Sequence, residues 1–396
     1  KKVLAINSGS SSFKFKLFSL PDEKVVAFGM ADRVGLPGAS FKIALQDGNE
    51  HIEHVEVPDQ EAAVSLLFKA LKKYHVVEDL NEIVGVGHRV VSGGEIFKDS
   101  TVVDQEVLQK IKDLSNFAPL HNPAEARGIE AFMHVLPKVP QVAVFDTSFH
   151  QTLDPVHYLY SIPYDYYKEY GARKYGAHGT SVHYVTLEAA KMMKKDLKDL
   201  KLITCHLGSG SSITAVKNGK SYDTSMGFSP LSGITMGTRS GDIDPSLLQH
   251  LMHETGISMD EMINILNKKS GLLGISGISS DMRDLKYNKN PRAILARKIF
   301  LNRIVRYIGA FIAEMGGVDA IVLTAGVSEG DVGMRKAIMD SFKYMGVDPD
   351  YEANKTNGQK VITKPDSKIQ VMIIPTNEEL MIARDVVRLT NCATLA

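Results

Sequence analysis

Short continuous runs of apolar residues alternate along this chain with longer stretches in which apolar residues recur at helical spacing. Runs of the first kind are typical of strands buried on both faces of a sheet. They cover residues 83–91, 141–149, 200–208, 319–327 and 369–377, and each ends in a polar or glycine-rich turn. Helical spacing is clearest over 64–74 and 294–315. The alternation predicts an α/β protein, in which ligands collect at the carboxyl ends of the strands.

Two segments combine strands and turns in the same way. "AINSGSSSFKFKLF" (5–18) and "LITCHLGSGSSITAV" (202–216) each place a Gly and Ser turn between two apolar stretches, with Asn7 or His206 just before the turn. Each segment predicts a hairpin. Two halves of similar content follow from these hairpins, but Gly and Ser turns between strands are common, so chance and duplication are equally open on this pattern alone.

The length of 396 residues also favours two domains, because one hydrophobic core rarely serves so long a chain. Residues 150–200 are rich in Tyr, Pro and Gly and resemble an insertion or a domain junction. The chain has no low-complexity tract and no long linker, so we expect the two halves to pack face to face across a cleft.

The charge of the chain indicates which partners it can bind, and its cysteine content indicates the compartment in which it works. Lys plus Arg and Asp plus Glu each total 46, so the formal charge is zero and nothing indicates binding to nucleic acid or to an anionic membrane. Cys205 and Cys392 cannot form a disulfide framework. Neither a signal peptide nor an apolar run of membrane-spanning length is found. We expect a soluble cytoplasmic protein with a small-molecule or protein partner.

The two Gly and Ser turns can present successive backbone N–H groups and hydroxyls to a phosphate. For either turn alone, an ordinary hairpin is the better interpretation. The common nucleotide motifs are absent: "NGKS" at 218–221 ends like a P-loop, but Thr214 stands where that motif needs Gly, and no GxGxxG follows a strand. If the chain binds a nucleotide, it uses a different cradle.

Two arginines are candidates for binding an anion. "GHRVVSGGE" places His88 and Arg89 inside an apolar run, where a guanidinium needs an anionic partner. "TMGTRSGDIDP" places Arg239 among small residues, with Asp242 and Asp244 just after it. A structural salt bridge is the alternative for each arginine. Because the guanidinium fork holds a carboxylate or phosphate bidentately, two such arginines favour the functional interpretation.

Histidines and carboxylates occur at other strand ends and helix starts. His121 and His178 each precede a predicted helix, and although a lone His is usually structural, a helix N-terminus attracts anions and lowers the pKa of a His. Asp146 ends an apolar run and needs a partner, for which Mg²⁺ carried by a nucleotide is one candidate. Glu378 and Glu379 begin a helix, where capping and metal binding are equally open.

Two further segments suit a nucleotide. "LTAGVSEGD" (323–331) predicts a strand, a glycine-rich loop and then a helix near 334–345, and "GISSDMRDL" (277–285) contains Asp281 and Arg283 on either side of Met282. Helix capping explains each segment taken alone. Together with the two phosphate-type turns, they suit the base and ribose of a nucleotide.

Nine segments, taken in order, resemble the acetate kinases. They are "NSGSSSFK", "GHRVVSGGE", "DTSFH", "HGTS", "HLGSGSS", "MGTRSGDIDP", "SSDMRDL", "LTAG" and "TNEEL", and the resemblance runs from residue 3 to about residue 388. It implies the fold of the acetate and sugar kinase, heat-shock chaperone and actin superfamily: an α/β, duplicated actin-like ATPase (ribonuclease H-like) fold with two domains flanking a nucleotide cleft. The resemblance also explains the two similar hairpins, because each copy of the duplicated domain contains one.

The implied domains are an N-terminal actin-like domain over 1–148, on which a helix over about 380–396 packs, and a nucleotide-binding actin-like domain over 149–379. The implied activity is reversible transfer of the γ-phosphoryl group of ATP to acetate, giving acetyl phosphate and ADP. The resemblance also implies that the reaction depends on Mg²⁺ and that the protein is a homodimer. A carboxylate is already a nucleophile at neutral pH, so direct in-line transfer needs only positioning and charge neutralisation.

The resemblance also implies roles for single residues. Asn7 and Glu378 resemble the magnesium-site residues, and Arg89 and Arg239 resemble the pair that binds the carboxylate and the transferring phosphoryl group. Asp146 matches an active-site acid that positions the metal or an arginine. The implied transition-state stabilisers are His178 and Arg239, with His121 nearby. The implied wall of the acyl methyl pocket is Val91, Leu120 and Pro230. The implied ATP contacts are Ser10, Ser12, Lys14, His206, Leu207, Gly208, Ser209, Gly210, Asp281, Met282, Arg283, Gly326, Val327, Ser328, Glu329 and Gly330.

Five positions depart from the family's common pattern. Ala177 replaces a Phe of the methyl pocket, and a smaller wall would admit propionate, since one methylene changes selectivity by only about 1 to 3 kcal/mol. Ser209 replaces an Asn in the second phosphate turn, where a hydroxyl still donates. Ser328 and Gly330 replace Gly and Asn, and Ser328 would be strained at a positive φ. Ser92 replaces a His.

Three alternatives follow from the same residues. A propionate or broader short-chain acyl kinase is the nearest one. An actin-like or chaperone-like ATPase has the same fold, but it gives no purpose to the arginines and His178, and the chain shows no peptide-binding domain. A sugar kinase would need Asp146 as the base that deprotonates a hydroxyl.

Overall fold

The computed structural model describes residues 1–392 and divides the chain into two compact units. Unit 1 contains residues 1–149 and the segment from Asn377 onward, and unit 2 contains His150–Thr376. The chain therefore passes from one unit to the other twice. Among the described residues, no helix has the length and apolarity that a membrane-spanning segment needs.

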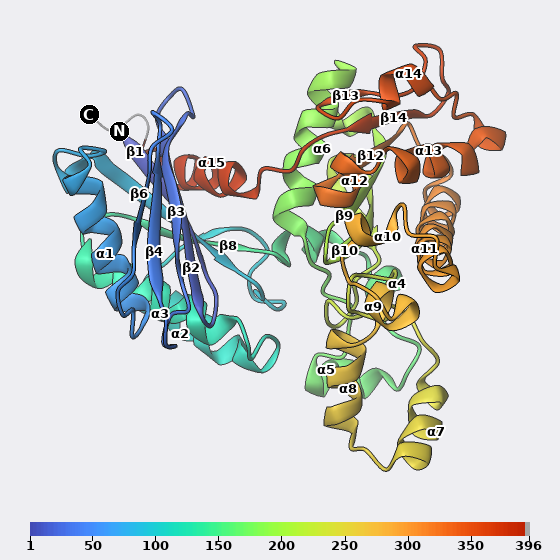
Figure 1. The fold of residues 1–396 in the computed structure, drawn as a ribbon, viewed down its shortest axis with the longest axis horizontal. Coiled ribbons are helices and arrows are strands. Elements are labelled where there is room, and N and C mark those ends of the chain that lie inside the picture. The colour runs from blue at the N-terminus through green and yellow to red at the C-terminus, as the bar shows by residue number, and fades with distance from the viewer. Residues whose placement is uncertain (393–396) are drawn as a thin grey trace. The chain divides into compact units, whose positions relative to one another are not determined.

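Unit 1 is built on one mixed sheet of eight strands in the order β5-β4-β3-β2-β1-β6-β8-β7 (Figure 1). Its strands are β1 Lys2–Ser8, β2 Ser12–Ser19, β3 Val25–Asp32, β4 Ser40–Leu45, β5 Glu50–Glu53, β6 Ile83–Val90, β7 Thr101–Val102 and β8 Gln141–Phe145, and its helices are α1 Gln60–Lys73, α2 Gln105–Asp113, α3 Asn122–Val135 and α15 Glu378–Thr390. Strands β1, β6 and β8 are parallel, and β1 and β2 form the predicted first hairpin.

Helices cover both faces of this sheet because β1 is apolar on both sides. Leu4 and Ile6 belong to the same apolar core as α1 and α3, while Val3 and Ala5 pack in a second core with Ile382 and other residues of α15. Successive side chains of a strand point to opposite faces, so a continuous apolar run needs two covering layers. In Figure 1, α15 lies beside the blue strands of this unit although it comes from the far end of the chain.

Unit 2 is built on a six-stranded sheet in the order β11-β10-β9-β12-β14-β13. Its strands are β9 Lys201–Leu207, β10 Ser211–Lys217, β11 Lys220–Thr224, β12 Ala320–Thr324, β13 Lys360–Val361 and β14 Gln370–Ile373. Its helices are α4 Pro155–Tyr158, α5 Tyr164–Tyr170, α6 Gly179–Met193, α7 Pro245–Thr255, α8 Met259–Lys268, α9 Gly271–Ser276, α10 Met282–Leu285, α11 Pro291–Met315, α12 Ala325–Gly330, α13 Val332–Ser341 and α14 Tyr351–Asn354. Helix α11 covers the predicted stretch near 294–315 and buries Phe300, Ile304 and Ile308 in the core of the unit.

The two sheets repeat one topology. In unit 1 the order β3-β2-β1-β6-β8 combines an antiparallel meander with two parallel additions beside its first strand, and β11-β10-β9-β12-β14 in unit 2 does the same. One hairpin therefore opens each copy, as the duplicated fold requires. The predicted repeat is confirmed by strand order and direction, which chance similarity of two turns does not produce.

One predicted element is wrong. The sequence predicts a glycine-rich loop after β12, but residues Ala325–Gly330 form helix α12. Ala325, with a φ of 68°, makes the sharp turn out of the strand, and the two glycines lie near the ends of the helix, where they cost less than in its interior. The predicted strain at Ser328 is also absent, because the positive φ falls on Ala325 instead.

Candidate active site

In unit 1, three candidate residues lie at the carboxyl ends of neighbouring parallel strands. Asn7 is the second-to-last residue of β1, Arg89 is near the end of β6, and Asp146 directly follows β8. The strand register pairs Ile6 with His88 and Arg89 with Val144, so the three candidates occupy one edge of the sheet. This is the edge at which open α/β sheets bind ligands.

Arg89 and Asp146 form a bidentate ion pair. Nε of Arg89 lies 3.1 Å from both carboxylate oxygens, and Nη2 lies 2.7 Å from Oδ2. Asp146 is buried and holds the pKa of Arg89 above its ordinary range. The salt-bridge alternative for Arg89 is therefore realised. Among the described residues, however, Nη1 of Arg89 has no partner, so one arm of the fork remains available to an anion.

Two more carboxyl groups surround this pair and change its chemistry. Burial, together with the nearby charge of Asp146, raises the pKa of Glu125 to about 8 and the pKa of Glu378 to about 7. Glu125 accepts a hydrogen bond from the backbone N–H of Val91 at 3.0 Å. One guanidinium thus faces three carboxyl groups. Repulsion between these carboxylates is reduced when one of them is protonated or when a cation binds.

The donor set of unit 1 fits a hard divalent cation. Asn7 offers an amide oxygen and Glu378 a carboxylate, which are ligands that Mg²⁺ prefers. Both residues line one cavity of about 300 Å³, together with Lys14 and Arg89. Glu378 begins α15 directly after its N-cap residue, so the helix-start interpretation also holds. Burial is the main cause of its raised pKa.

The other predicted residues of unit 1 differ in their surroundings. Ser10 and Ser12 lie in and beside the first hairpin turn, which is closed by a hydrogen bond from Gly9 N to Ser12 O. Leu120 is 68% exposed, and His121 is the N-cap residue of α3. The predicted roles of Leu120 and His121 stay predictions. His88, by contrast, is a core residue that bonds Gln141 and whose pKa burial lowers to about 4.

In unit 2, Arg239 has no acidic partner among the described residues. The two aspartates that follow it are used elsewhere: Asp242 accepts hydrogen bonds from Gly233 N and Tyr307 Oη, and Asp244 caps α7. The Nη1 of Arg239 donates to Pro230 O at 3.2 Å and lies 3.7 Å from the sulfur of Met236. The predicted loop salt bridge is therefore not formed, and a half-buried guanidinium remains without a counter-charge.

His178 and Arg239 converge on the second Gly and Ser turn. A Cβ built on Gly210 would lie 3.4 Å from His178 Nε2 and 3.5 Å from Arg239 Nη1. His178 is the N-cap residue of α6, its Nδ1 lies 2.8 Å from Ser212 Oγ, and its ring stacks on His206 with centroids 4.0 Å apart. The absence of a side chain at Gly210 leaves room for a phosphoryl group beside a cation and an imidazole.

The predicted nucleotide residues of unit 2 meet in one cavity of about 520 Å³. From the prediction it is lined by Gly208, Ser209, Asp281, Met282, Arg283, Gly326, Val327 and Gly330, and the sequence missed Leu272, Ser280, Lys286 and Asp331. Five predicted contacts do not line it. Leu207 is a core residue, and Gly210 lies beside His178 and Arg239. The hydroxyl of Ser328 donates to Cys205 O, Glu329 accepts from Thr376 N, and His206 stacks on His178.

Asp281 and Arg283 carry out two tasks at once. Asp281 caps α10 by accepting from the backbone N–H of Arg283, and the two side chains form a bidentate pair with a closest distance of 2.6 Å. The capping alternative is thus correct. Since both side chains also line the cavity, capping holds their polar groups at its wall instead of excluding a ligand role.

Helix α12, which forms part of that wall, is held by a buried arginine that the sequence analysis missed. The Arg335 side chain is fully buried, and its Nη1 donates to the carbonyls of Ser328 and Glu329 at 3.1 Å. Its Nε donates to Asn354 Oδ1 at 2.7 Å. Arg335 therefore satisfies carbonyl groups at the C-terminal end of α12, which helps explain why this segment is a helix.

Ala177 lies in a small apolar cluster with Met226 and Met236, and all three are buried. Met236 also contacts the guanidinium of Arg239. Flexible methionine side chains adapt to irregular gaps, so they fill space next to a small residue such as Ala177. An apolar cluster of this kind suits the alkyl group of a short carboxylate.

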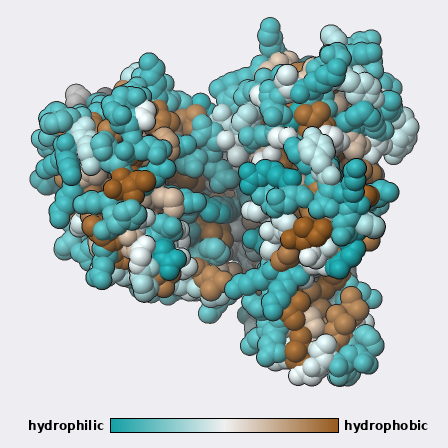
Figure 2. All heavy atoms as spheres, in the orientation of Figure 1, coloured by the Kyte–Doolittle hydropathy of each residue, from teal (hydrophilic) through white to brown (hydrophobic). Residues whose placement is uncertain are grey.

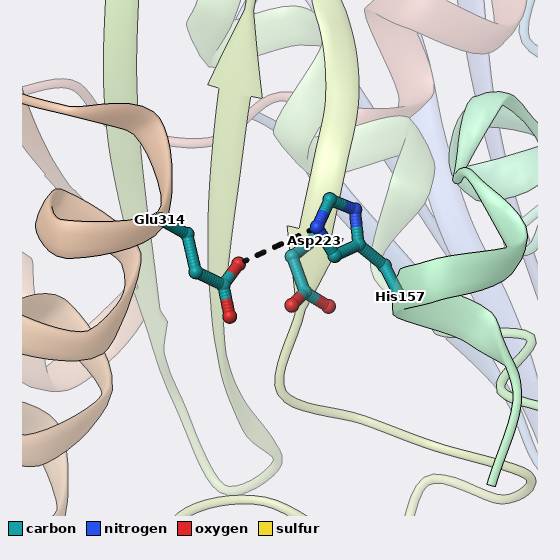
Figure 3. A group of neighbouring side chains, drawn as sticks. All are labelled: His157, Asp223 and Glu314. Atoms are coloured by element: carbon teal, nitrogen blue, oxygen red, sulfur yellow. Dashed lines mark ion pairs between the residues drawn. The ribbon is translucent and has the colours of Figure 1, made fainter.

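One other group of residues has metal-ligand chemistry. His157 of α4, Asp223 of β11 and Glu314 of α11 point toward one another, with a His157 to Glu314 distance of 4.0 Å (Figure 3). However, Lys174 Nζ already lies 2.8 Å from Asp223 Oδ1, and burial raises the pKa of Glu314 to about 7. Lys174 and the raised pKa of Glu314 balance these carboxylates, which makes the group a partly exposed ion-pair network of unit 2.

Comparison with known proteins gives one consistent result. A family model described as the Acetokinase family matches residues 2–384. The acetate kinase of Limosilactobacillus fermentum is 54% identical over 98% of each chain. Among solved structures, an acetate kinase of Porphyromonas gingivalis matches with a TM-score of 0.95 and 42% identity, over 98% of this chain and 99% of that one. A propionate kinase of Francisella tularensis matches with a TM-score of 0.91 and 38% identity over the same shares.

Proposed function

This chain belongs to the acetokinase family, and we propose that it is an acetate kinase working by direct in-line transfer with Mg²⁺. Membership of this family supports the acetate kinase activity, and it agrees with the duplicated actin-like fold. The single observation that carries the in-line proposal is the convergence of Arg239 and His178 on Gly210, where residues 1–392 provide no counter-charge to the Arg239 guanidinium.

The reaction needs few groups. A carboxylate oxygen of acetate attacks the γ-phosphorus of ATP, the bond from that phosphorus to the bridging oxygen breaks, and ADP leaves with the electron pair. No base is required, because the nucleophile is ionised at neutral pH. Catalysis then consists of holding the two substrates in line and neutralising the charge on the transferring group.

We assign these tasks by unit. In unit 2, the cavity lined by Asp281, Gly326 and their neighbours takes the nucleotide, and Arg239 with His178 neutralises the transferring phosphoryl group. In unit 1, Arg89 takes the carboxylate with its available arm, and Asp146 positions Arg89. Asn7 and Glu378 hold Mg²⁺, which when bound neutralises phosphate charge. Lys14, Ser10 and Ser12 stay proposed phosphate contacts of the first hairpin.

Propionate is a second candidate substrate. Ala177 supports it, because the methionines packed against this small residue can shift to admit one more methylene. The discrimination from one methylene is at most about 1 to 3 kcal/mol, so activity with both acids is expected.

A homodimer in the cytoplasm is proposed for the assembly. Figure 2 shows apolar atoms gathered over the part of unit 2 that contains α7 and α8, where Leu247, Met259 and Ile263 are 44%, 48% and 38% exposed. Contiguous exposed apolar surface of this kind is typical of protein interfaces. Both Cys205 and Cys392 are buried free thiols, which suits a reducing compartment.

The experiment that tests the function is acyl phosphate formation from ATP and Mg²⁺, trapped with hydroxylamine, for acetate, propionate, butyrate and glycerol side by side. Acetate should give the highest rate, with propionate next. Propionate above acetate would move the activity to the sibling substrate and implicate Ala177. Release of ADP without any acyl phosphate would instead support an ATPase or a sugar kinase.

A further inference from the structure

A fully buried histidine outside the proposed substrate-binding residues contacts the backbone next to His178. His150 lies in a short 3-10 turn over Ser148–Thr152 and has no exposed surface. Its Nε2 lies 2.7 Å from the carbonyl oxygen of Ala177, and its Nδ1 lies 2.7 Å from Ser221 Oγ. The first of these contacts is to the peptide group that precedes His178.

The two contacts fix the tautomer of His150. A carbonyl oxygen can only accept, so Nε2 carries the proton and donates to Ala177 O. In the neutral ring, Nδ1 is then an acceptor, and the hydroxyl of Ser221 donates to it. Ser221 is itself held by Thr152, whose hydroxyl donates to the Ser221 carbonyl at 2.8 Å. The imidazole is therefore fixed at both nitrogens.

The backbone that His150 holds is unusual. His178 has a φ of 59° and Gly176 a φ of 79°, so the chain leaves the ordinary conformations on both sides of Ala177. For a residue other than Gly or Asn such a conformation is strained and persists only when its surroundings impose it. A Cβ on Gly176 would lie 2.7 Å from the His150 ring, so the ring packs directly against this segment.

We propose that His150 is a positioning residue for catalysis, which orients the Ala177–His178 peptide so that the His178 imidazole meets Arg239 at Gly210. Because the peptide group is planar, fixing its carbonyl also fixes the N–H of His178 and limits the direction of its side chain. The inference rests on the proposed role of His178 and extends it to a residue that touches neither substrate.

Two variants separate the hydrogen bond from the bulk of the ring. In His150→Gln the amide nitrogen reaches about as far as Nε2 and can still donate to Ala177 O, whereas in His150→Asn it reaches only the position of Nδ1. We expect His150→Asn to lower kcat by about 100-fold, as a small misplacement of a catalytic group does. KM for ATP should change by less than about twofold, and His150→Gln should recover most of kcat.

A double-mutant cycle with His178→Ala tests whether His150 acts through His178. In that background, His150→Asn should have no further effect on kcat, because the group it positions is gone. An equal loss of kcat in both backgrounds, or full activity of His150→Asn in the unaltered background, would overturn the proposal. Calorimetric binding of ADP and the circular dichroism spectrum verify that each variant is folded.

If His150→Asn does not fold, Ser221→Ala provides the same test, because it removes only the donor to Nδ1. Its loss of kcat should also disappear in the His178→Ala background, and a loss that persists there would count against the proposal. The single variant His178→Ala separately tests the role of His178. The hydroxylamine assay on the unaltered protein tests the function itself. Failure of the His150 proposal, of the His178 role and of the function can therefore be distinguished from one another.

Discussion

Arg89 and Arg239 carry the same charge in different surroundings, and this difference separates their effects on stability. Arg89 is paired bidentately with a buried aspartate, whereas Arg239 bonds a backbone carbonyl and contacts a thioether. A guanidinium already paired is fixed in direction before substrate arrives. One without a counter-charge is poised to accept an anion.

Substituting either arginine by Ala should lower kcat by about three orders of magnitude, since each neutralises charge on the reacting groups. Only Arg89→Ala should also lower the free energy of unfolding, by about 3 kcal/mol, because it leaves Asp146 buried without its partner. Steady-state kinetics and urea unfolding measure the two effects. Arg127→Ala, at an exposed position of α3, is the matched control. Equal destabilisation by the two active-site variants would contradict the assignment.

The raised pKa values of Glu378 and Glu125 predict an inverse dependence of stability on pH. A carboxyl group with a higher pKa in the folded state keeps its proton while the unfolded chain loses it, so the free energy of unfolding falls as pH rises. For the metal-free protein this fall should run from about pH 5 to pH 8, through the pKa values of about 7 and about 8. The midpoint of thermal unfolding in EDTA measures it.

Mg²⁺ should oppose this trend, because in the proposed site it binds the ionised form of Glu378. The increase in unfolding temperature caused by Mg²⁺ should therefore be larger at pH 8 than at pH 6 and absent in Glu378→Gln. A Mg²⁺ effect that is independent of pH, or that survives in Glu378→Gln, would place the metal on other residues.

At the scale of elements, the second hairpin turn is a place where one methyl group matters. In Gly210→Ala the new Cβ would occupy the space that His178 and Arg239 border, at 3.4 and 3.5 Å, so we expect kcat to fall by at least about tenfold. Stability should change little, because Gly210 has no positive φ. Gly309→Ala in α11, where nothing lies within 4 Å, is the control and should keep full activity.

The sequence analysis correctly predicted the elements whose signal is local. Both hairpins, the buried strands and α11 follow from apolar periodicity and turn residues, and the resemblance supplied their repeat. Helix α12 was predicted wrongly because its C-terminal carbonyls are satisfied by Arg335, which the local pattern does not connect to it. Glu125 was missed because a glutamate in the first turn of a helix is ordinary, and only tertiary packing buries it beside Arg89.

At the scale of the whole molecule, each unit has its own apolar core, and the cavity that we propose for the nucleotide lies within unit 2. ADP should therefore slow amide hydrogen exchange in unit 2, most strongly near 208–210, 281–286 and 326–331, since binding suppresses local opening. Exchange measured by mass spectrometry with and without ADP tests this. Slowing confined to unit 1 would contradict the proposed nucleotide site.

The position of helix α15 in the sequence determines when the core of unit 1 can be completed during synthesis. This helix covers one face of the unit 1 sheet, with Ile382 and Val386 packed against Val3 and Ala5, yet the ribosome makes it only after all of unit 2. Until then, that apolar face of the nascent N-terminal unit lacks its cover. Unit 2, which is continuous in sequence, can complete its core first. The N-terminal half of this chain is therefore the part expected to need chaperone protection during translation.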